Sequence, residues 1–165
     1  MPSTYEKIAT NTLGSAAPTV TFSSIAGTYT DLFLVMQTSV ASGTLQNLMR
    51  VNGDTGSNYS TTYLSGNGSS AVSVRGSNVT YAELGYNDYN TTAIGQMTIV
   101  NLMNYSNTTT NKTFLVRGSN ANNGVSATVS LWRSTAAITS ITITNSSAVN
   151  YAVGSTFTLY GIKAA

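Results

Sequence analysis

Five carboxylates are the acidic groups with which this chain of 165 residues could do chemistry: Glu6, Asp31, Asp54, Glu83 and Asp88. A glycosidase needs two such groups facing one another across a groove, and no such pair is evident in the sequence. Asp31 directly precedes an apolar run, where a carboxylate is expected to bond turn amides. Asp54 lies in NGDTGSN, which has too few carboxylates for a twelve-residue calcium loop. Glu83 is as well explained by a position on a solvent-exposed strand face as by a role in a functional site.

Histidine and cysteine are both absent from the sequence. Their absence removes disulfides, thiolate nucleophiles, imidazole bases and the usual zinc ligands. A serine–lysine pair is formally open through Lys7, Lys112 or Lys163, but no motif supports one. We therefore expect a protein that is not an enzyme and that holds no cofactor and no metal.

Tyrosine is the enriched residue type with a use in binding. Five of the ten tyrosines fall between residues 59 and 89, among Asn, Ser and Gly: Tyr59, Tyr63, Tyr81, Tyr86 and Tyr89. Flat apolar rings beside adaptable hydrogen-bonding groups are typical of recognition surfaces. Together with Arg75, these tyrosines are the candidate contacts for a protein partner or a glycan. The alternative is that they cover the ends of a sandwich core with their hydroxyl groups in water.

Charge is sparse and scattered along the chain. Charged residues make up 7% of the sequence, against ~25% in a typical protein, and the net charge is +2. No basic patch argues for nucleic acid, and no apolar run approaches the ~20 residues of a membrane helix. No signal-peptide core precedes the first strand, so we expect synthesis in a cytoplasm. A weakly charged surface suits a subunit packed into an assembly, where arginines could pair across subunit contacts: Arg50, Arg75, Arg117 and Arg133.

The elements that must position these residues are organised around the apolar run of residues 32–36, LFLVM. In a strand this run places Leu32, Leu34 and Met36 on one side and Phe33 and Val35 on the other. A strand that is apolar on both faces is covered on both faces, which predicts a central strand with protein above and below it.

Further strands recur every ten to fifteen residues, with turn signals such as Asn52-Gly53 between them. No segment keeps a helical period. The pattern predicts an all-β fold, an antiparallel two-sheet sandwich with jelly-roll-like topology. Residues 1–14 are predicted to form an extended arm or edge strand, and residues 15–165 a single sandwich domain. In residues 94–103 the apolar residues change from odd to even positions, so the inward face is ambiguous. A bulge near Val100-Asn101 would bring both sets of apolar residues to the same face.

Several blocks resemble a family of small virion structural proteins of tailed bacteriophages of the cyanophage type. The blocks are YEKIATNTLGSAAPTVTFSSI (5–25), TYTDLFLV (28–35), RVNGDTGSNYSTTYLSGNG (50–68), LWRSTAAITSITI (131–143) and GSTFTLYGIKAA (154–165). The resemblance implies a location in the virion and transfers no catalytic residues.

Three roles follow from this resemblance and from the tyrosines. The first is a capsid decoration, or cement, protein that binds over major capsid subunits; by analogy it would be a homo-oligomer, with a trimer as our expectation. The second is a tail-fibre, spike or baseplate tip protein that binds a host surface glycan and contacts other tail proteins. The third is a free carbohydrate-binding module.

Overall fold

The alternating segments form twelve β-strands in the computed structural model, which describes residues 4–93 and 95–163. The large sheet has eight strands in the order β1 (Tyr5–Thr12), β12 (Thr156–Ile162), β3 (Asp31–Thr38), β8 (Gln96–Leu102), β9 (Lys112–Asn120), β10 (Gly124–Trp132), β5 (Tyr59–Gly66) and β6 (Ala71–Val79). The small sheet has four strands in the order β2 (Val20–Phe22), β11 (Ile141–Asn145), β4 (Asn47–Val51) and β7 (Ala82–Glu83). The predicted all-β, two-sheet antiparallel sandwich is confirmed.

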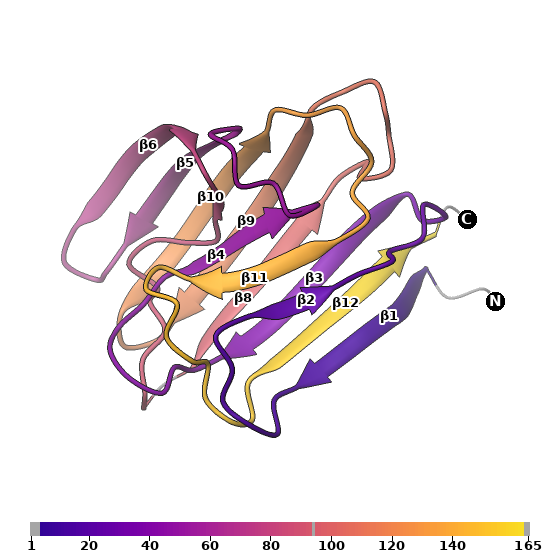
Figure 1. Ribbon diagram of the computed structural model, residues 1–165. Helices are drawn as coiled ribbons and strands as arrows, with labels where there is room; N and C mark the ends of the chain where they lie inside the picture. Colours follow the sequence, from indigo (N-terminus) through magenta and orange to yellow (C-terminus); the bar gives the residue numbers. More distant parts are fainter. Residues whose placement is uncertain (1–3, 94, 164–165) are drawn as a thin grey trace.

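The two sheets differ in width, and this difference shapes the molecule. In Figure 1 the small sheet lies in front of the middle of the large sheet, while β5 and β6 extend beyond it. Jelly rolls commonly divide eight strands between two packed sheets. The division into eight and four strands does not confirm the jelly-roll topology that we expected. None of the described residues belongs to a helix that could cross a membrane.

The core lies between the two sheets and is built by the inward side chains of each strand. From β3 the buried residues are Leu32, Leu34 and Met36, all with no exposed surface. Opposite them the small sheet contributes Met49 from β4 and Ile141 from β11, also fully buried. Leu, Ile and Met side chains on two facing sheets make the dry layer that drives sheet packing.

β3 occupies the predicted central position, between β12 and β8. However, Phe33 and Val35, which we predicted to be covered by protein, are only half-buried. They lie on the face of the large sheet that points away from the small sheet, and no element of the described chain packs there. The prediction was wrong on this point because an apolar outward face does not require cover from the same chain.

The predicted N-terminal arm or edge strand is β1, which pairs with β12 at one edge of the large sheet. Its register shifts between Lys7 and Ala9, the irregularity expected of an edge strand. Residues 1–3 of the predicted arm lie outside the described residues. The bulge predicted near Val100-Asn101 is absent, because β8 pairs in unbroken register with both of its neighbours.

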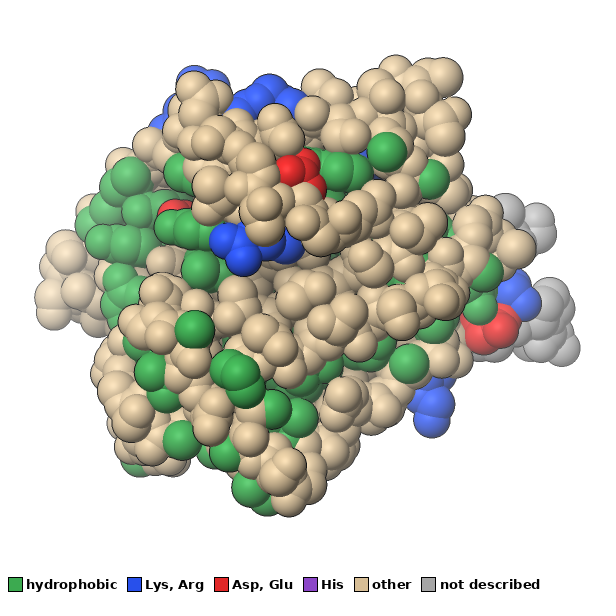
Figure 2. Space-filling view, viewed as in Figure 1, with side chains coloured by type: hydrophobic (Ala, Val, Ile, Leu, Met, Phe, Trp, Pro, Cys, Tyr) green, Lys and Arg blue, Asp and Glu red, His purple; other side chains and the backbone are tan. Residues whose placement is uncertain are grey.

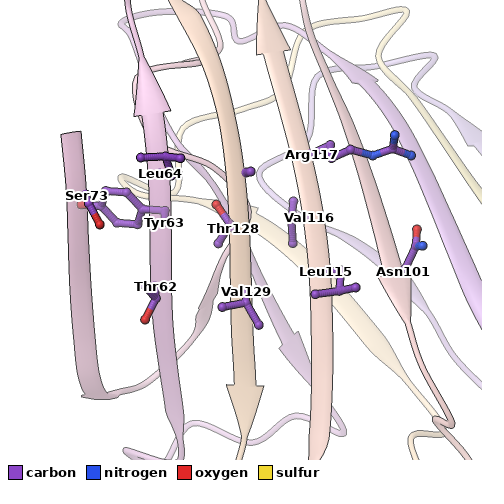
Figure 3. Close-up of a pocket in the computed structure, with 11 residues that line it drawn as sticks. Thr62, Tyr63, Leu64, Ser73, Asn101, Leu115, Val116, Arg117, Thr128 and Val129 are labelled. Carbon is purple, nitrogen blue, oxygen red and sulfur yellow. The ribbon is translucent and has the colours of Figure 1, made fainter. Parts of the chain in front are cut away.

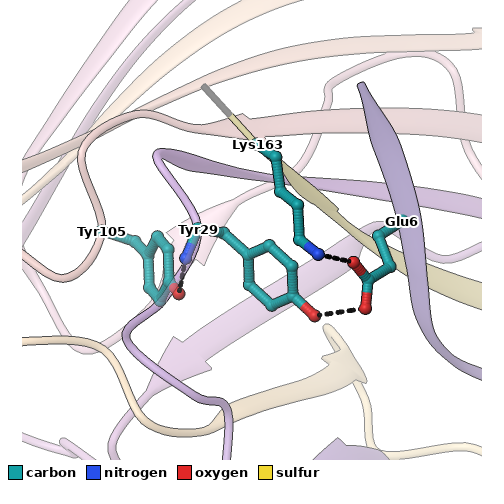
Figure 4. Close-up of polar contacts among 4 residues, drawn as sticks. All are labelled: Glu6, Tyr29, Tyr105 and Lys163. Atoms are coloured by element: carbon teal, nitrogen blue, oxygen red, sulfur yellow. Dashed lines mark hydrogen bonds and ion pairs between the residues drawn. The ribbon is translucent and has the colours of Figure 1, made fainter. Parts of the chain in front are cut away.

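The open end of the sandwich beside β1 is closed by a small polar cluster (Figure 4). Glu6 of β1 forms an ion pair with Lys163, and the Tyr29 hydroxyl donates a hydrogen bond of 3.2 Å to the same carboxylate. The ring of Tyr29 packs on Gly161, where a side chain would collide with it. Tyr105 in turn accepts a hydrogen bond of 3.4 Å from the Tyr29 backbone N–H. These contacts fasten the first strand to the last.

The Asn52-Gly53 turn connects β4 with the loop that precedes β5. Both residues have positive φ, 52° and 65°, as the sequence predicts for this dipeptide. The side chain of Asn52 also accepts hydrogen bonds from the backbone N–H groups of Thr139 and Ser140, at 2.8 and 3.1 Å. The turn therefore holds the approach to β11 as well as reversing the chain.

Candidate functional site

Two of the five carboxylates are used in contacts at the rim of the sandwich. Lys163 holds the pKa of Glu6 below its usual value through the ion pair. Asp31 accepts a hydrogen bond of 2.6 Å from the backbone N–H of Asn104, so the turn-amide role predicted for it is confirmed. Neither carboxylate faces a groove.

Asp54 fixes a turn and also contacts the buried side chain of Trp132. Its carboxylate accepts hydrogen bonds from the Gly56 backbone N–H at 2.8 Å and from Trp132 Nε1 at 2.6 Å. The bond from the indole, followed by that from Asn58, lowers the pKa of Asp54. Asp54 therefore positions the only tryptophan of the chain rather than a substrate.

The remaining two carboxylates are partly or fully buried. Glu83 is half-buried, and burial raises its pKa. A fully solvated strand face was one of the two positions that we considered for it. Asp88 is 1% exposed, and its pKa is raised to about 6 by burial. Its Oδ2 accepts a hydrogen bond of 2.6 Å from Gln96 Nε2. Among the residues that the structure describes, no three His, Cys, Asp or Glu side chains gather as metal ligands would.

Asp88 ends a line of buried polar side chains between the sheets. Asn47 donates to Gln96 at 3.0 Å and accepts from Asn90 at 2.7 Å, while Thr38 donates to Asn90 at 2.7 Å. Every one of these groups is at most 1% exposed. Buried amides that satisfy one another hold Asp88 and Asn90 against β3, β4 and β8.

The most extensive feature of the surface is the face of the large sheet turned away from the small sheet, which we call the outer face. Its side chains alternate with the buried ones along each strand. Four of its apolar residues stand well clear of the protein: Leu64 and Val125 are 59% exposed, Leu115 is 48% exposed and Val129 is 41% exposed.

A shallow groove of about 510 Å³ runs across the outer face on strands β5, β8, β9 and β10, with β6 at its edge. Figure 3 shows Leu64, Leu115 and Val129 on neighbouring strands. Pairing places Val129 between Thr62 and Leu115 in one row across the sheet. The groove is lined by aliphatic side chains, among them Leu64, Leu115 and Val129, with polar ones such as Asn101 and Arg117 beside them. It is open, unlike the enclosed pockets that bind small molecules. Its breadth suits a macromolecular surface.

Cations accompany these apolar residues. Arg117 extends from β9 across β8 in Figure 3 and is exposed. Arg75 pairs with Thr62, and Lys7 pairs with Tyr160, so both point to the outer face as well. The outer face therefore carries positive charge at both ends and near its middle.

The predicted tyrosines divide into different environments. Tyr63 stacks on Tyr86 with ring centroids 4.4 Å apart, and Tyr86 meets the edge of Tyr89 at 5.8 Å. Tyr59 is fully buried, and its hydroxyl accepts a hydrogen bond of 3.1 Å from the Val51 backbone N–H, so it does not lie on a surface. Tyr81 is half-buried and joins no ring contact of the described residues.

The cluster of Tyr63, Tyr86 and Tyr89 is more a packing unit than an open platform. Burial raises the pKa of Tyr63 to about 12, and Tyr63 is only 6% exposed. The cluster rests on the inner side of β5, where the small sheet does not reach. Figure 2 shows hydrophobic side chains gathered over β5 and β6 on a face that is otherwise mostly polar.

The chain matches no protein-family model, no curated protein and no solved structure. The surface must therefore be interpreted from its own residues. Sequence reasoning selected Arg75 but missed the apolar residues of the outer face. The signal was present in β10, where Val125, Ala127, Val129 and Leu131 alternate with Ser and Thr. That pattern identifies the shared face and leaves open which face is inside.

Proposed function

We propose that this chain is a structural protein of a tailed-bacteriophage virion that decorates the capsid, binding over major capsid subunits through the outer face of its large sheet. The observation that carries the proposal is the exposed apolar surface of that face. Monomeric soluble proteins rarely leave a contiguous apolar sheet face open, and large exposed patches mark interaction sites. The sequence blocks that resemble phage virion proteins suggest that the assembly is a virion.

A decoration protein acts by mass action and needs no reacting group. Because it binds the assembled shell and not the separated subunits, it shifts the equilibrium away from disassembly. The broad, flat outer face suits this role better than an enclosed pocket would. A homotrimer over threefold positions is the arrangement that the analogy favours.

Copy number tests the proposal. Densitometry of stained gels of purified particles should give a number of copies comparable to that of the major capsid protein. Particles made without the chain should lose their genome at a lower temperature than complete particles. A handful of copies per particle would contradict capsid decoration and would place the protein in the tail.

The second candidate function is a tail-fibre, spike or baseplate tip protein that binds a host glycan. The half-buried rings of Tyr86 and Tyr89, which lie next to the buried Tyr63, favour it, since aromatic faces pack on sugar rings. This candidate predicts few copies per virion and binding to host-cell polysaccharide that Tyr86→Ala abolishes.

A further inference from the structure

We infer that the outer face docks on a protein surface of different sequence that presents carboxylates around an apolar patch, and that Arg117 is the central cationic contact. The inference rests on the proposed function for the identity of the bound surface, which would be a capsid subunit. It adds the chemistry by which that surface is recognised.

The cations of the chain fall into two groups, those with a partner among the described residues and those without one. Four of the seven are satisfied within the chain: Lys163 pairs with Glu6, Lys112 bonds the Thr110 and Thr135 carbonyls, Arg50 bonds the Thr80 carbonyl, and Arg133 bonds the Ser57 carbonyl. In the part of the chain that the structure describes, Lys7, Arg75 and Arg117 make no such contact. All three lie on the outer face.

A second copy of this chain is a poor source of the carboxylates, because its acids already have partners. All five acids lie within the described residues, and each has a use inside its own chain. Glu6 and Asp31 bond Lys163 and the Asn104 backbone N–H. Asp54 accepts a hydrogen bond from Trp132, Glu83 from Gln46 and Asp88 from Gln96. Pairing a carboxylate of a second copy with Arg117 would therefore compete with a contact inside that copy, whereas a surface of different sequence can present carboxylates without such contacts.

The area of the outer face also fits a protein interface. Eight strands about 4.8 Å apart and an overlap of about seven residues give a face of roughly 34 by 20 Å, or on the order of 700 Å². Specific interfaces bury about 600 to 1,000 Å² on each partner, and the area of the outer face falls within this range. Leu115 and Val129 would lie in its centre and the cations around them, the pattern of an apolar core with arginine anchors.

The register also predicts the spacing of the partner's acids. Arg75 and Arg117 are three strands and two residues apart, about 16 Å, and Lys7 and Arg117 are four strands and two residues apart, about 20 Å. The row of residues from Arg75 to β9 passes through Thr62 and Val129 to Leu115. The row from Lys7 to β9 passes through Tyr160, Phe33 and Asn101. These three cations stand singly, with about 16 to 20 Å between neighbours, and do not form the clustered basic patch of a nucleic-acid site. This favours protein carboxylates over the phosphates of nucleic acid.

The test uses particles assembled without this chain, to which the purified chain is added back. Arg117→Gln removes one positive charge from the outer face. Thr21→Glu, on the exposed side of the small sheet, is the matched control. Both variants lower the net charge of the chain from +2 to +1. We expect Arg117→Gln to weaken rebinding by about tenfold or more and Thr21→Glu to leave it unchanged. Thermal unfolding of both variants confirms that they are folded.

Each other outcome overturns a defined part of the account. If the wild-type chain rebinds at high copy number and Arg117→Gln rebinds as well, the carboxylate inference fails and the proposed function stands. If the wild-type chain does not rebind, both fail. If Arg117→Gln or Val129→Thr alters the sedimentation of the purified chain, a second copy covers the face. If a DNA duplex of about 30 base pairs binds the wild-type chain and not Arg117→Gln, the partner is nucleic acid.

Discussion

Replacing Asp88 by asparagine should remove a specific pH dependence from the stability of this protein. Asp88 is buried, and burial raises the pKa of its carboxyl group to about 6 from 3.8. The Gln96 side chain and the backbone N–H groups of Tyr86 and Asp88 oppose this rise by bonding the charged form. Burial outweighs them because no cation of the described chain pairs with the carboxylate.

The sign and size of the effect follow from linkage. The folded protein binds the Asp88 proton more tightly than the unfolded chain does, so its stability rises as the pH falls from about 6 toward 4. Each pKa unit is worth about 1.36 kcal/mol, so this group adds about 2 kcal/mol to the free energy of unfolding between about pH 7.5 and pH 4.5. The amide in the Asp88→Asn variant is neutral throughout this range and would add nothing.

The assay is urea unfolding at about pH 7.5 and 4.5 at constant ionic strength, followed by the fluorescence of Trp132. The difference in unfolding free energy between wild type and Asp88→Asn should change by about 2 kcal/mol between the two pH values. Asp54→Asn is the control of opposite sign: because the pKa of Asp54 is lowered, its contribution is lost as the pH falls. Equal pH dependence in wild type and Asp88→Asn would refute the reasoning.

Two further predictions concern packing. Gly118→Ala should destabilise the fold by about 2 kcal/mol or more, because the new methyl group would collide with Asp88 Oδ2. Gly76→Ala is its matched control: the nearest atom is 3.7 Å away, so urea unfolding should show no loss and a gain of up to about 1 kcal/mol. Tyr86→Ala should cost about 1–2 kcal/mol by removing the ring stacked on Tyr63, whereas Tyr86→Phe, which keeps the ring, should change stability by less than about 0.5 kcal/mol. A Tyr86→Ala protein as stable as wild type would show that the stack does not hold the fold.

Local patterns were sufficient to predict the fold class. The apolar run of β3 and the Asn52-Gly53 turn each correspond to a structural feature, since strand period and turn chemistry act over a few residues. The division of strands between sheets could not be predicted. It depends on which distant strands pair, as β12 does with β1 and β3.

The candidate site shows where alternation alone is ambiguous. In β10 the buried side is polar, because Ser130 bonds Thr61 and the carbonyl of Glu83 beneath the edge of the small sheet. The exposed side carries Val129 and its aliphatic neighbours. A rule that places apolar residues in the core would assign the wrong face of β10 to the interior. Knowing which face is covered requires the position of β7 and of the segment that follows it.

The central claim is that the outer face is covered when the protein is in place on the virion. Met97 lies on that face and is 48% exposed, whereas Met36 and Met49 are buried in the core. Peroxide oxidation followed by mass spectrometry should convert Met97 to its sulfoxide readily in the free chain and much more slowly in intact particles. Equal oxidation of Met97 in the free chain and in particles would contradict the account.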